Sequence, residues 1–293
     1  MNPKNITCQI NKLQSKYYAR KGRAVYYIEP IDGIIFQSKL PSVADMELFN
    51  QQEYKGGIYR EYSEMELQKK KTARRRLTYI RNYGKVNGRL LDIGCSVGFG
   101  LEVAQDLGFD VQGIELSLEA IAIAKLTVSD KINKADANEH ICKYFECFGV
   151  VTAYDIIEHT QNPKAFLSDL YNALEQGGVI AITSPDTDHF LRYFMGSNWS
   201  MLQPMQHTFL FSKRSIKKML KDAGFENINV YPTKKTLTFN YLFGQLSQTN
   251  PVISKLYYYA RKFIPTSIGD TSVDVNIGEF FAIAKKPIKT IIP

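Results

Sequence analysis

A short glycine-rich segment constrains this chain of 293 residues more than any other feature. Residues 89–100 read RLLDIGCSVGFG. The apolar first half predicts a buried strand, which breaks into a tight turn carrying Gly94, Gly98 and Gly100. Glycine permits positive φ angles and lets the backbone come close to a neighbouring group. The segment therefore predicts a strand, a turn that lies against a ligand, and a helix.

Three further segments follow at the spacing of βαβ units. FDVQGIELS (109–117) predicts a second strand ending at Glu115, 23 residues after Asp92, where dinucleotide-binding folds use an acid to bind ribose hydroxyls. DAN (136–138) and FGVVTAYDIIEH (148–159) come next, and the latter predicts another buried strand. The four segments together predict an α/β fold with a doubly wound parallel sheet.

This series of segments resembles class I S-adenosylmethionine-dependent methyltransferases. The resemblance implies a Rossmann-like, seven-stranded sheet with an antiparallel last strand, and S-adenosyl-L-methionine as cofactor. It also implies cofactor contacts from the glycine-rich motif, the ribose-binding acid, the adenine segment and the acid ending the fourth strand: Asp92, Gly94, Cys95, Gly98, Glu115, Leu116, Asp136, Ala137 and Asp155. Ser96 stands where many relatives have glycine; because serine is small, we expect cofactor binding to survive.

Two more stretches resemble one branch of this class. AYDIIEHTQNP (153–163) and QHTFLFSKRSIKKMLKDAGF (206–225) are similar to segments of ubiquinone-biosynthesis O-methyltransferases and of sugar and natural-product methyltransferases. ENINVYP and GEFFAIAKK predict the last two strands, at the antiparallel edge. We expect a methyltransferase domain over residues 59–293, with an insertion at 233–278.

Residues 1–58 are expected to form a separate, ribbon-like segment with a β-hairpin. Many relatives carry a zinc ribbon here, and the resemblance places Glu29 and Asp32 where those relatives have cysteines. Cys8 alone cannot build a tetrahedral thiolate site. We therefore expect a hairpin that has lost its metal.

Composition narrows the class of protein. The apolar runs are too short to span a bilayer, and the N-terminus lacks a signal-peptide pattern. The four cysteines are scattered and form no disulfide or zinc framework. These features favour a cytoplasmic protein.

Basic residues are concentrated before the glycine-rich segment. Residues 1–89 hold 18 Lys and Arg against 8 Asp and Glu, and the densest run is KKKTARRR at 69–76. One interpretation is a solvated helix face balanced by neighbouring acids. The other is contact with an anionic partner: a phosphate on the substrate, a nucleic acid or a lipid surface.

Methyl transfer to oxygen usually needs a base, and histidine has a suitable pKa of about 6.5. His159 follows the fourth strand beside Glu158, and His207 lies before a later helix, so we predict that His159, His207 and Glu158 are catalytic. One alternative is that these residues and Asp155 hold a divalent metal. Another is that Glu158 and His159 cap the next helix. We favour a base without metal, and a structural role for His189.

Aromatic residues have two interpretations, a lid over the pocket or core packing. They are Tyr54, Tyr59, Tyr62, Phe190, Tyr193, Phe194 and Trp199, and we expect Trp199 to stack on the acceptor. The stretch 253–264, aromatic and basic, fits a membrane surface, a lid or an oligomer contact.

The resemblance thus implies O-methylation of a small or medium acceptor. We expect a sugar of a surface polysaccharide or glycolipid, carried on a lipid or a nucleotide. An RNA methyltransferase and a non-enzymatic cofactor-binding relative are the alternatives, although nucleic acid is not the expected partner.

Overall fold

The computed structural model describes residues 6–55, 64–84, 88–136, 140–241 and 271–289, and its largest element is a seven-stranded sheet. The sheet order is β11-β14-β9-β8-β5-β6-β7; β14 runs antiparallel to both neighbours, and the strands from β9 to β7 run parallel. The strands are β5 (Arg89–Ile93), β6 (Asp110–Glu115), β7 (Ile132–Lys134), β8 (Phe148–Tyr154), β9 (Leu174–Pro185), β11 (Glu226–Pro232) and β14 (Glu279–Lys285). The predicted sheet is confirmed, with β14 inserted between β9 and β11.

Helices cover both faces of this sheet because its central strands are apolar on both faces. In β8 every residue but the last is buried, as is typical of a parallel strand between two helical layers. One face packs against α8 and α10, and the other against α3 and α4. The helices are α1 (Val43–Lys55), α3 (Glu66–Gly84), α4 (Phe99–Asp106), α5 (Leu118–Ile123), α6 (Leu126–Ser129), η1 (Ile157–His159), α8 (Pro163–Ala173), α9 (Phe190–Met195), η2 (Gly196–Asn198) and α10 (Lys213–Asp222).

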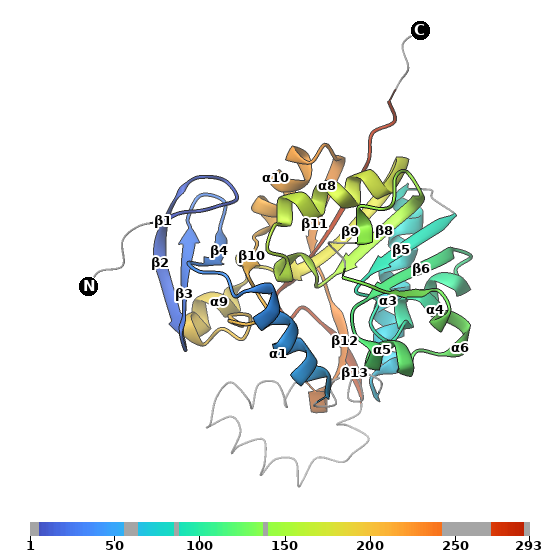
Figure 1. Cartoon of the computed structure of the whole chain (residues 1–293), viewed down its shortest axis with the longest axis horizontal. Coiled ribbons are helices and arrows are strands. Elements are labelled where there is room, and N and C mark those ends of the chain that lie inside the picture. The colour runs from blue at the N-terminus through green and yellow to red at the C-terminus, as the bar shows by residue number, and fades with distance from the viewer. Residues whose placement is uncertain (1–5, 56–63, 85–87, 137–139, 242–270, 290–293) are drawn as a thin grey trace.

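The N-terminal region forms a second sheet, more extensive than the predicted hairpin. Its antiparallel strands, in spatial order, are β1 (Ile6–Thr7), β2 (Gln14–Lys21), β3 (Ala24–Glu29), β4 (Ile34–Gln37) and β10 (Phe209–Leu210). Figure 1 shows β1–β4 in blue at one end of the molecule, beside α9 and the later strand β10. Because β10 comes from the later part of the chain, the sheet spans the boundary at residue 58, which stays a prediction.

Trp199 belongs to the core beneath this second sheet. Its side chain is only 3% exposed and packs in one cluster with Tyr26, Ile35 and Leu210. The expectation that Trp199 stacks on an acceptor is therefore wrong. A loop flanked by Gly and Ser predicted exposure, but the loop is covered by strands that come from far earlier in the sequence.

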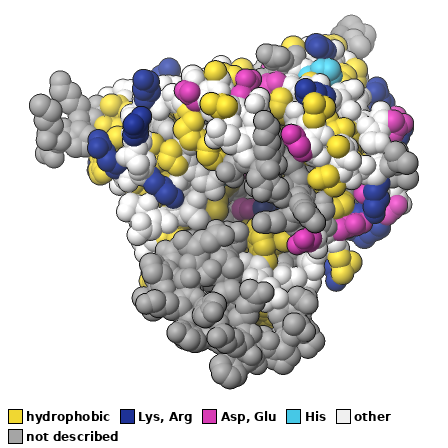
Figure 2. Space-filling model, turned by 60° about the horizontal axis from the view of Figure 1, so that its bottom comes forward, with side chains coloured by type: hydrophobic (Ala, Val, Ile, Leu, Met, Phe, Trp, Pro, Cys, Tyr) yellow, Lys and Arg dark blue, Asp and Glu magenta, His cyan; other side chains and the backbone are white. Residues whose placement is uncertain are grey.

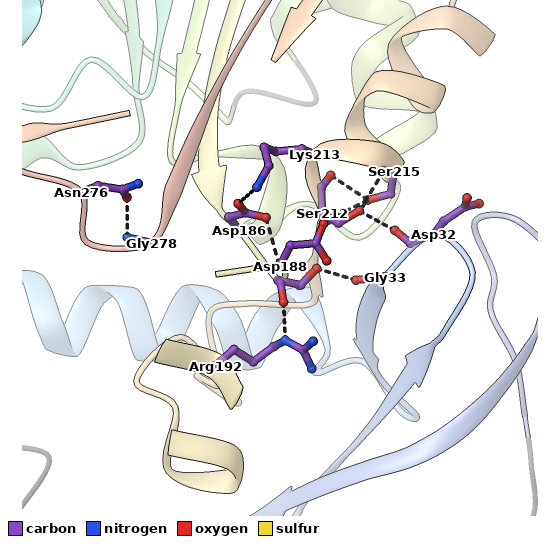
Figure 3. Close-up of polar contacts among 11 residues, drawn as sticks. Asp32, Gly33, Asp186, Asp188, Arg192, Ser212, Lys213, Ser215, Asn276 and Gly278 are labelled. Carbon is purple, nitrogen blue, oxygen red and sulfur yellow. Dashed lines mark hydrogen bonds and ion pairs between the residues drawn. The ribbon is translucent and has the colours of Figure 1, made fainter. Parts of the chain in front are cut away.

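Polar contacts join the N-terminal sheet to the carboxyl edge of the large sheet (Figure 3). The hydroxyl of Ser212, which caps α10, donates to the carbonyl of Asp32, and the hydroxyl of Thr187 donates to the carbonyl of Gly33. The guanidinium of Arg214 lies 3.4 Å from the Asp32 carboxylate. The two sheets are thus held together at the turn between β3 and β4.

The same turn carries the residues expected at the former cysteine positions. The Asn11 amide donates to Glu29 at 2.8 Å and to Asp32 at 2.9 Å, and Glu29 also accepts the backbone N–H of Ile31 and of Asp32. Cys8 is buried nearby, and burial raises the pKa of its thiol, with the two carboxylates adding to the effect. A side-chain amide therefore bridges the two turns, and the thiol stays protonated.

We expect the purified protein to contain no stoichiometric zinc. Asn11→Ala is expected to lower the free energy of unfolding by about 1–3 kcal/mol, since two buried carboxylates lose a donor. Elemental analysis and urea denaturation test these two statements. Stoichiometric zinc that is lost on mutating Cys8 would contradict the first, and an unchanged unfolding midpoint in Asn11→Ala would contradict the second.

Charge is distributed unevenly over the surface. Figure 2 shows Lys and Arg side chains gathered at the end that carries the N-terminal sheet, whereas basic and acidic side chains alternate at the opposite end. Among the helices of the described residues, none is long and apolar enough to cross a membrane. The stretch 253–264 and most of the insertion lie outside the described residues.

Candidate functional site

The glycine-rich turn follows β5, as predicted. It requires glycine because of its own backbone conformation and its close packing against another loop of the chain. Gly94 has a φ of 70°, and a Cβ there would lie 2.2 Å from the Ile156 side chain. The turn therefore packs closely against the loop after β8. Ser96, the departure from glycine, also has a positive φ of 52°. Serine thus occupies a left-handed conformation that glycine adopts more readily.

Glu115 ties this turn to the end of β6. Its carboxylate accepts the backbone N–H of Ser96 at 2.8 Å and of Ser117 at 2.9 Å, and the residue is 6% exposed. Leu116 follows it, half-buried, and Gly98 begins α4 with a φ of 81°. Asp136 is half-buried after β7, whereas Ala137 lies outside the described residues.

Asp92 is buried near the end of β5. The Thr152 hydroxyl donates to its carboxylate at 2.6 Å, and a Cβ on Gly100 would lie 3.1 Å from its other oxygen. Burial raises the pKa of Asp92 to about 7, and the nearby Glu115 carboxylate adds to the shift. Asp92 can therefore change its protonation state near neutral pH.

This shift predicts a pH dependence of stability. From about pH 4, the pKa of an unperturbed Asp, up to about 7, the folded state keeps a proton that the unfolded state has lost. Stability should therefore fall as pH rises through this window, by at most about 1.4 kcal/mol per pH unit. Asp92→Asn removes the effect, so its stability relative to wild type should increase from pH 4 to 7 in chemical denaturation. Parallel pH profiles of the two proteins would contradict the assignment.

A cavity lies between the carboxyl ends of the strands, helix α3 and strand β12 (Lys235–Thr238). Four predicted cofactor residues line it, namely Asp92, Gly94, Cys95 and Asp155. Lys69, Thr72 and Arg76 from α3, and Lys235 from β12, line it too. None of these four residues was predicted from the sequence to bind the cofactor. The spacing of 69, 72 and 76 places the first three on one helix face, which was the available signal.

The basic run on α3 thus divides between two faces. Lys70 pairs with Glu102 at 2.7 Å, Arg74 with Asp106 at 2.8 Å and Arg75 with Asp274 at 2.7 Å. These three side chains fit the interpretation of a helix face balanced by acids. Lys69 and Arg76 instead face the cavity, where burial and the nearby Lys235 lower the pKa of Lys69 to about 7.

Arg76 is the most unusual cation of the cavity. It is 8% exposed, and its Nε and Nη2 atoms have no hydrogen-bond partner among the described residues. Its guanidinium lies 4.8 Å from the centre of the Tyr154 ring, and Nη2 lies 3.8 Å from a Glu279 oxygen. A buried guanidinium with unused donors is costly, so this arrangement fits an anionic ligand group.

Asp155, directly after β8, is held from two sides. The Thr183 hydroxyl donates to Oδ1 at 2.8 Å, and the Lys235 ammonium donates to Oδ2 at 2.8 Å. Burial opposes ionisation of Asp155, but Lys235 and Arg76 hold its pKa below the usual value. Asp155 is therefore an anion at the edge of the cavity.

The structure brings His159 and His207 together. Their ring centres are 4.8 Å apart, and the rings meet edge to face. The Met201 carbonyl lies 2.8 Å from Nδ1 of His207; a carbonyl can only accept, so Nδ1 carries the proton and Nε2 keeps its lone pair. Burial, with His159 beside it, lowers the pKa of His207 to about 3. Burial also lowers the pKa of His159, so both rings are neutral at physiological pH.

Glu158 lies against this pair. It is 1% exposed, its Oε2 has no partner among the described residues, and burial raises its pKa, with Asp155 adding to the shift. One potential ligand atom from each of Glu158, His159 and His207 lies within 4.8 Å of the others. The helix-capping alternative is wrong, because the Asn162 side chain caps α8.

The remaining predicted residues lie elsewhere. The rings of His189 and Phe190 contact each other at a tilt, with 4.5 Å between their centres, outside the Glu158–His159–His207 group. Phe190, Tyr193 and Phe194 are exposed on α9. Tyr59, Tyr62 and the side chain of Tyr54 lie outside the described part of the chain.

Known proteins are similar to this chain over part of its length. Ubiquinone biosynthesis O-methyltransferase of Aromatoleum aromaticum is 32% identical over 111 residues, which cover 36% of this chain and 47% of the relative. The protein of the same name from Cereibacter sphaeroides is 26% identical over 162 residues, 52% of this chain and 64% of the relative. The chain thus spans about half the length of the first of these relatives, and somewhat more of the second.

Solved structures share the fold. A putative methyltransferase from Bacillus halodurans has a TM-score of 0.51 at 20% identity and covers 72% of this chain and 98% of its own. A SAM-dependent methyltransferase from Archaeoglobus fulgidus has a TM-score of 0.50 at 19% identity, with coverages of 74% and 94%. The family model described as a methyltransferase domain matches residues 64–230, more than half of the chain. This chain therefore belongs to the methyltransferase domain family.

Proposed function

We propose that this chain is an S-adenosylmethionine-dependent O-methyltransferase. When bound, this cofactor supplies a methyl group on a cationic sulfur. The observation that carries the proposal is a convergence at one edge of the sheet. There the glycine-rich turn, which Glu115 binds from behind, and the unpartnered donors of Arg76 face one cavity, and the two neutral imidazoles lie near Asp155, which lines the same cavity.

The residues present fit the cofactor. Glu115 would bind the ribose, Asp92 and Gly94 would lie along the methionine portion, and Asp136 would contact the adenine. The unused donors of Arg76 suit the methionine carboxylate, since a guanidinium binds carboxylates through paired hydrogen bonds. Ala137 keeps its proposed adenine contact, although it lies outside the described residues.

Catalysis would require removal of the proton from the acceptor hydroxyl. His207 Nε2, or His159 beside it, would accept the proton of an acceptor hydroxyl. The ionised Asp155 would favour the imidazolium that forms, and Glu158 would line the same site. The lowered pKa of both histidines keeps them in the basic form below pH 6.5. Activity should therefore persist to a lower pH than an unperturbed histidine would allow.

For the acceptor we propose a hydroxyl of a sugar, carried on a lipid or a nucleotide in polysaccharide or glycolipid biosynthesis. The resemblance to sugar methyltransferases supports it, as does the basic surface around the N-terminal sheet (Figure 2). The alternative acceptor is a phenolic hydroxyl, which the similarity to ubiquinone biosynthesis O-methyltransferases suggests. The free thiols of all four cysteines fit a cytoplasmic location.

Methyl-labelled S-adenosylmethionine tests the activity directly. The protein is incubated with a nucleotide sugar such as UDP-glucose, a catechol and a short RNA, and label transfer is followed by mass spectrometry. Label on a sugar oxygen supports the proposal, and label on the catechol moves the acceptor to the phenolic class. Steeply salt-dependent transfer to RNA would favour the RNA alternative. That alternative loses support because Lys70, Arg74 and Arg75 are paired with acids.

Glu115→Ala should weaken cofactor binding by about 1–3 kcal/mol, roughly 5- to 150-fold, because ribose hydroxyls and backbone N–H groups lose their acceptor. Isothermal titration calorimetry measures the loss. Glu175→Ala, an exposed glutamate at the start of β9, is the matched control and should bind as wild type does. Equal affinities for Glu115→Ala and wild type would contradict the assignment of the ribose site.

A further inference from the structure

The two described ends of the insertion, residues 235–238 and 272–275, pair as an antiparallel hairpin that lies across helix α3. β12 pairs with β13 (Ser272–Val275), and α3 holds both strands. Thr72 Oγ1 accepts the backbone N–H of Thr236 at 3.0 Å, Gln68 donates to the Ser272 hydroxyl at 3.1 Å, and Arg75 pairs with Asp274. The hairpin is therefore anchored as one wall of the cavity.

From this wall Lys235 reaches the ends of two strands of the large sheet. Its ammonium lies 2.8 Å from Asp155, which follows β8, and also bonds to Glu279 at the start of β14. Strand β9 lies between β8 and β14, so the Lys235 ammonium links two strands that are not direct neighbours in the sheet. The Lys235 side chain is 19% exposed and that of Glu279 is 8% exposed. The Lys235–Glu279 pair is thus largely shielded from solvent, where an ion pair is stronger than at the surface, whereas the Asp155 side chain is 37% exposed at the cavity.

Lys235 and Thr183 fix the orientation of the Asp155 carboxylate. Asp155 has a φ of 58°, an uncommon value for a residue other than glycine. Thr183 occupies one carboxylate oxygen and Lys235 the other, so the carboxylate has little freedom to rotate. Removal of Lys235 leaves one oxygen without its donor.

The charges around Asp155 make this pairing important. The groups that act on or are affected by its charge are Lys69 and Arg76 from α3, Glu158 and His159 from η1, His207 before β10, Lys235 from β12 and Glu279 from β14. Three carboxylates in this small region repel one another. Lys235 contacts two of them directly.

We propose that Lys235 is a positioning residue: it keeps the Asp155 carboxylate ionised and in a fixed orientation in the lining of the cofactor cavity. The first strand of the insertion is then part of the active site. This inference rests on the proposed function, in which Asp155 contacts the cofactor. Lys235 acts through Asp155 and not by touching the reacting atoms.

A double-mutant cycle on the cofactor dissociation constant tests this inference. Calorimetry compares S-adenosylmethionine binding by wild type, Lys235→Met, Asp155→Asn and the double variant. We expect Lys235→Met to weaken binding about tenfold or more, and to have no further effect once Asp155 is asparagine. Lys235→Arg should restore most of the affinity, because it keeps the charge next to Asp155. Independent, additive effects, or no rescue by Lys235→Arg, would overturn the inference.

Two further variants guard against misfolding. Lys234→Met changes the exposed neighbour on the same hairpin and should leave binding unchanged. If Lys235→Met fails to fold, the variant that combines Lys235→Met with Glu279→Gln takes its place in the cycle. This variant removes one positive and one negative charge, so the net charge of the site is unchanged. Wild type that binds no cofactor would overturn the proposed function, and this inference with it. Wild type that binds, with additive variants, overturns the inference alone.

Discussion

Replacing His207 with alanine is expected to lower turnover by about 10²–10⁴-fold and to leave the cofactor dissociation constant nearly unchanged. The reason is that, in the proposed mechanism, the neutral Nε2 of His207, beside His159, takes a proton from the acceptor hydroxyl. Label transfer under single-turnover conditions measures the chemical step. His140→Ala, which changes a histidine packed on Tyr144, is the control and should retain activity.

The same variants separate a base from a metal. For a base, chelators should leave activity unchanged, and Glu158→Ala should be less damaging than either histidine change. For a metal held by Glu158, His159 and His207, chelation should abolish activity and all three changes should be equally severe. We expect a base, because Lys235 already engages Asp155, the fourth ligand of the metal hypothesis. Full activity of the double His159→Ala, His207→Ala variant would contradict both mechanisms.

Arg76→Met is expected to weaken cofactor binding by about 1.5–3 kcal/mol, roughly 10- to 100-fold, because a charge-assisted hydrogen bond to the methionine carboxylate is lost. Calorimetry with S-adenosylmethionine measures this effect. Arg74→Met is the matched control: it lies on the same helix, and its partner is Asp106 at the surface. Binding by Arg74→Met should equal that of wild type.

A stability measurement distinguishes this role of Arg76 from a structural one. Buried donors without partners cost free energy in the ligand-free protein, and this offsets the loss of the ion pair with Glu279, so Arg76→Met should change the free energy of unfolding only slightly. Urea denaturation without cofactor tests this. A variant that is strongly destabilised, with affinity lost only in proportion to unfolding, would show that Arg76 serves the fold.

The elements that carry local patterns could be predicted from the sequence. The turn at Gly94 follows a short apolar strand, Glu115 ends the next strand, and β14 is antiparallel as expected. His159 and His207 were both predicted as catalytic residues, and the structure brings their rings together. Each of these features depends on residues close together in sequence, or on the topology that such residues imply.

Long-range pairings could not be predicted in this way. Lys235 reaches Asp155 across 80 positions of the chain, and nothing near either residue indicates the contact. β10 has only two residues, too few for a periodic pattern, yet it pairs with β4 and closes the N-terminal sheet over Trp199. The cation face of α3 was hidden within a run of basic residues in which Lys70, Arg74 and Arg75 are paired with acids.

Titration of the wild-type protein with S-adenosylmethionine in a calorimeter tests the central claim most directly. The account predicts one cofactor bound per chain with a dissociation constant in the micromolar range, and binding of S-adenosylhomocysteine at the same site by competition. Absence of binding at millimolar cofactor, by a protein shown to be folded, would contradict it.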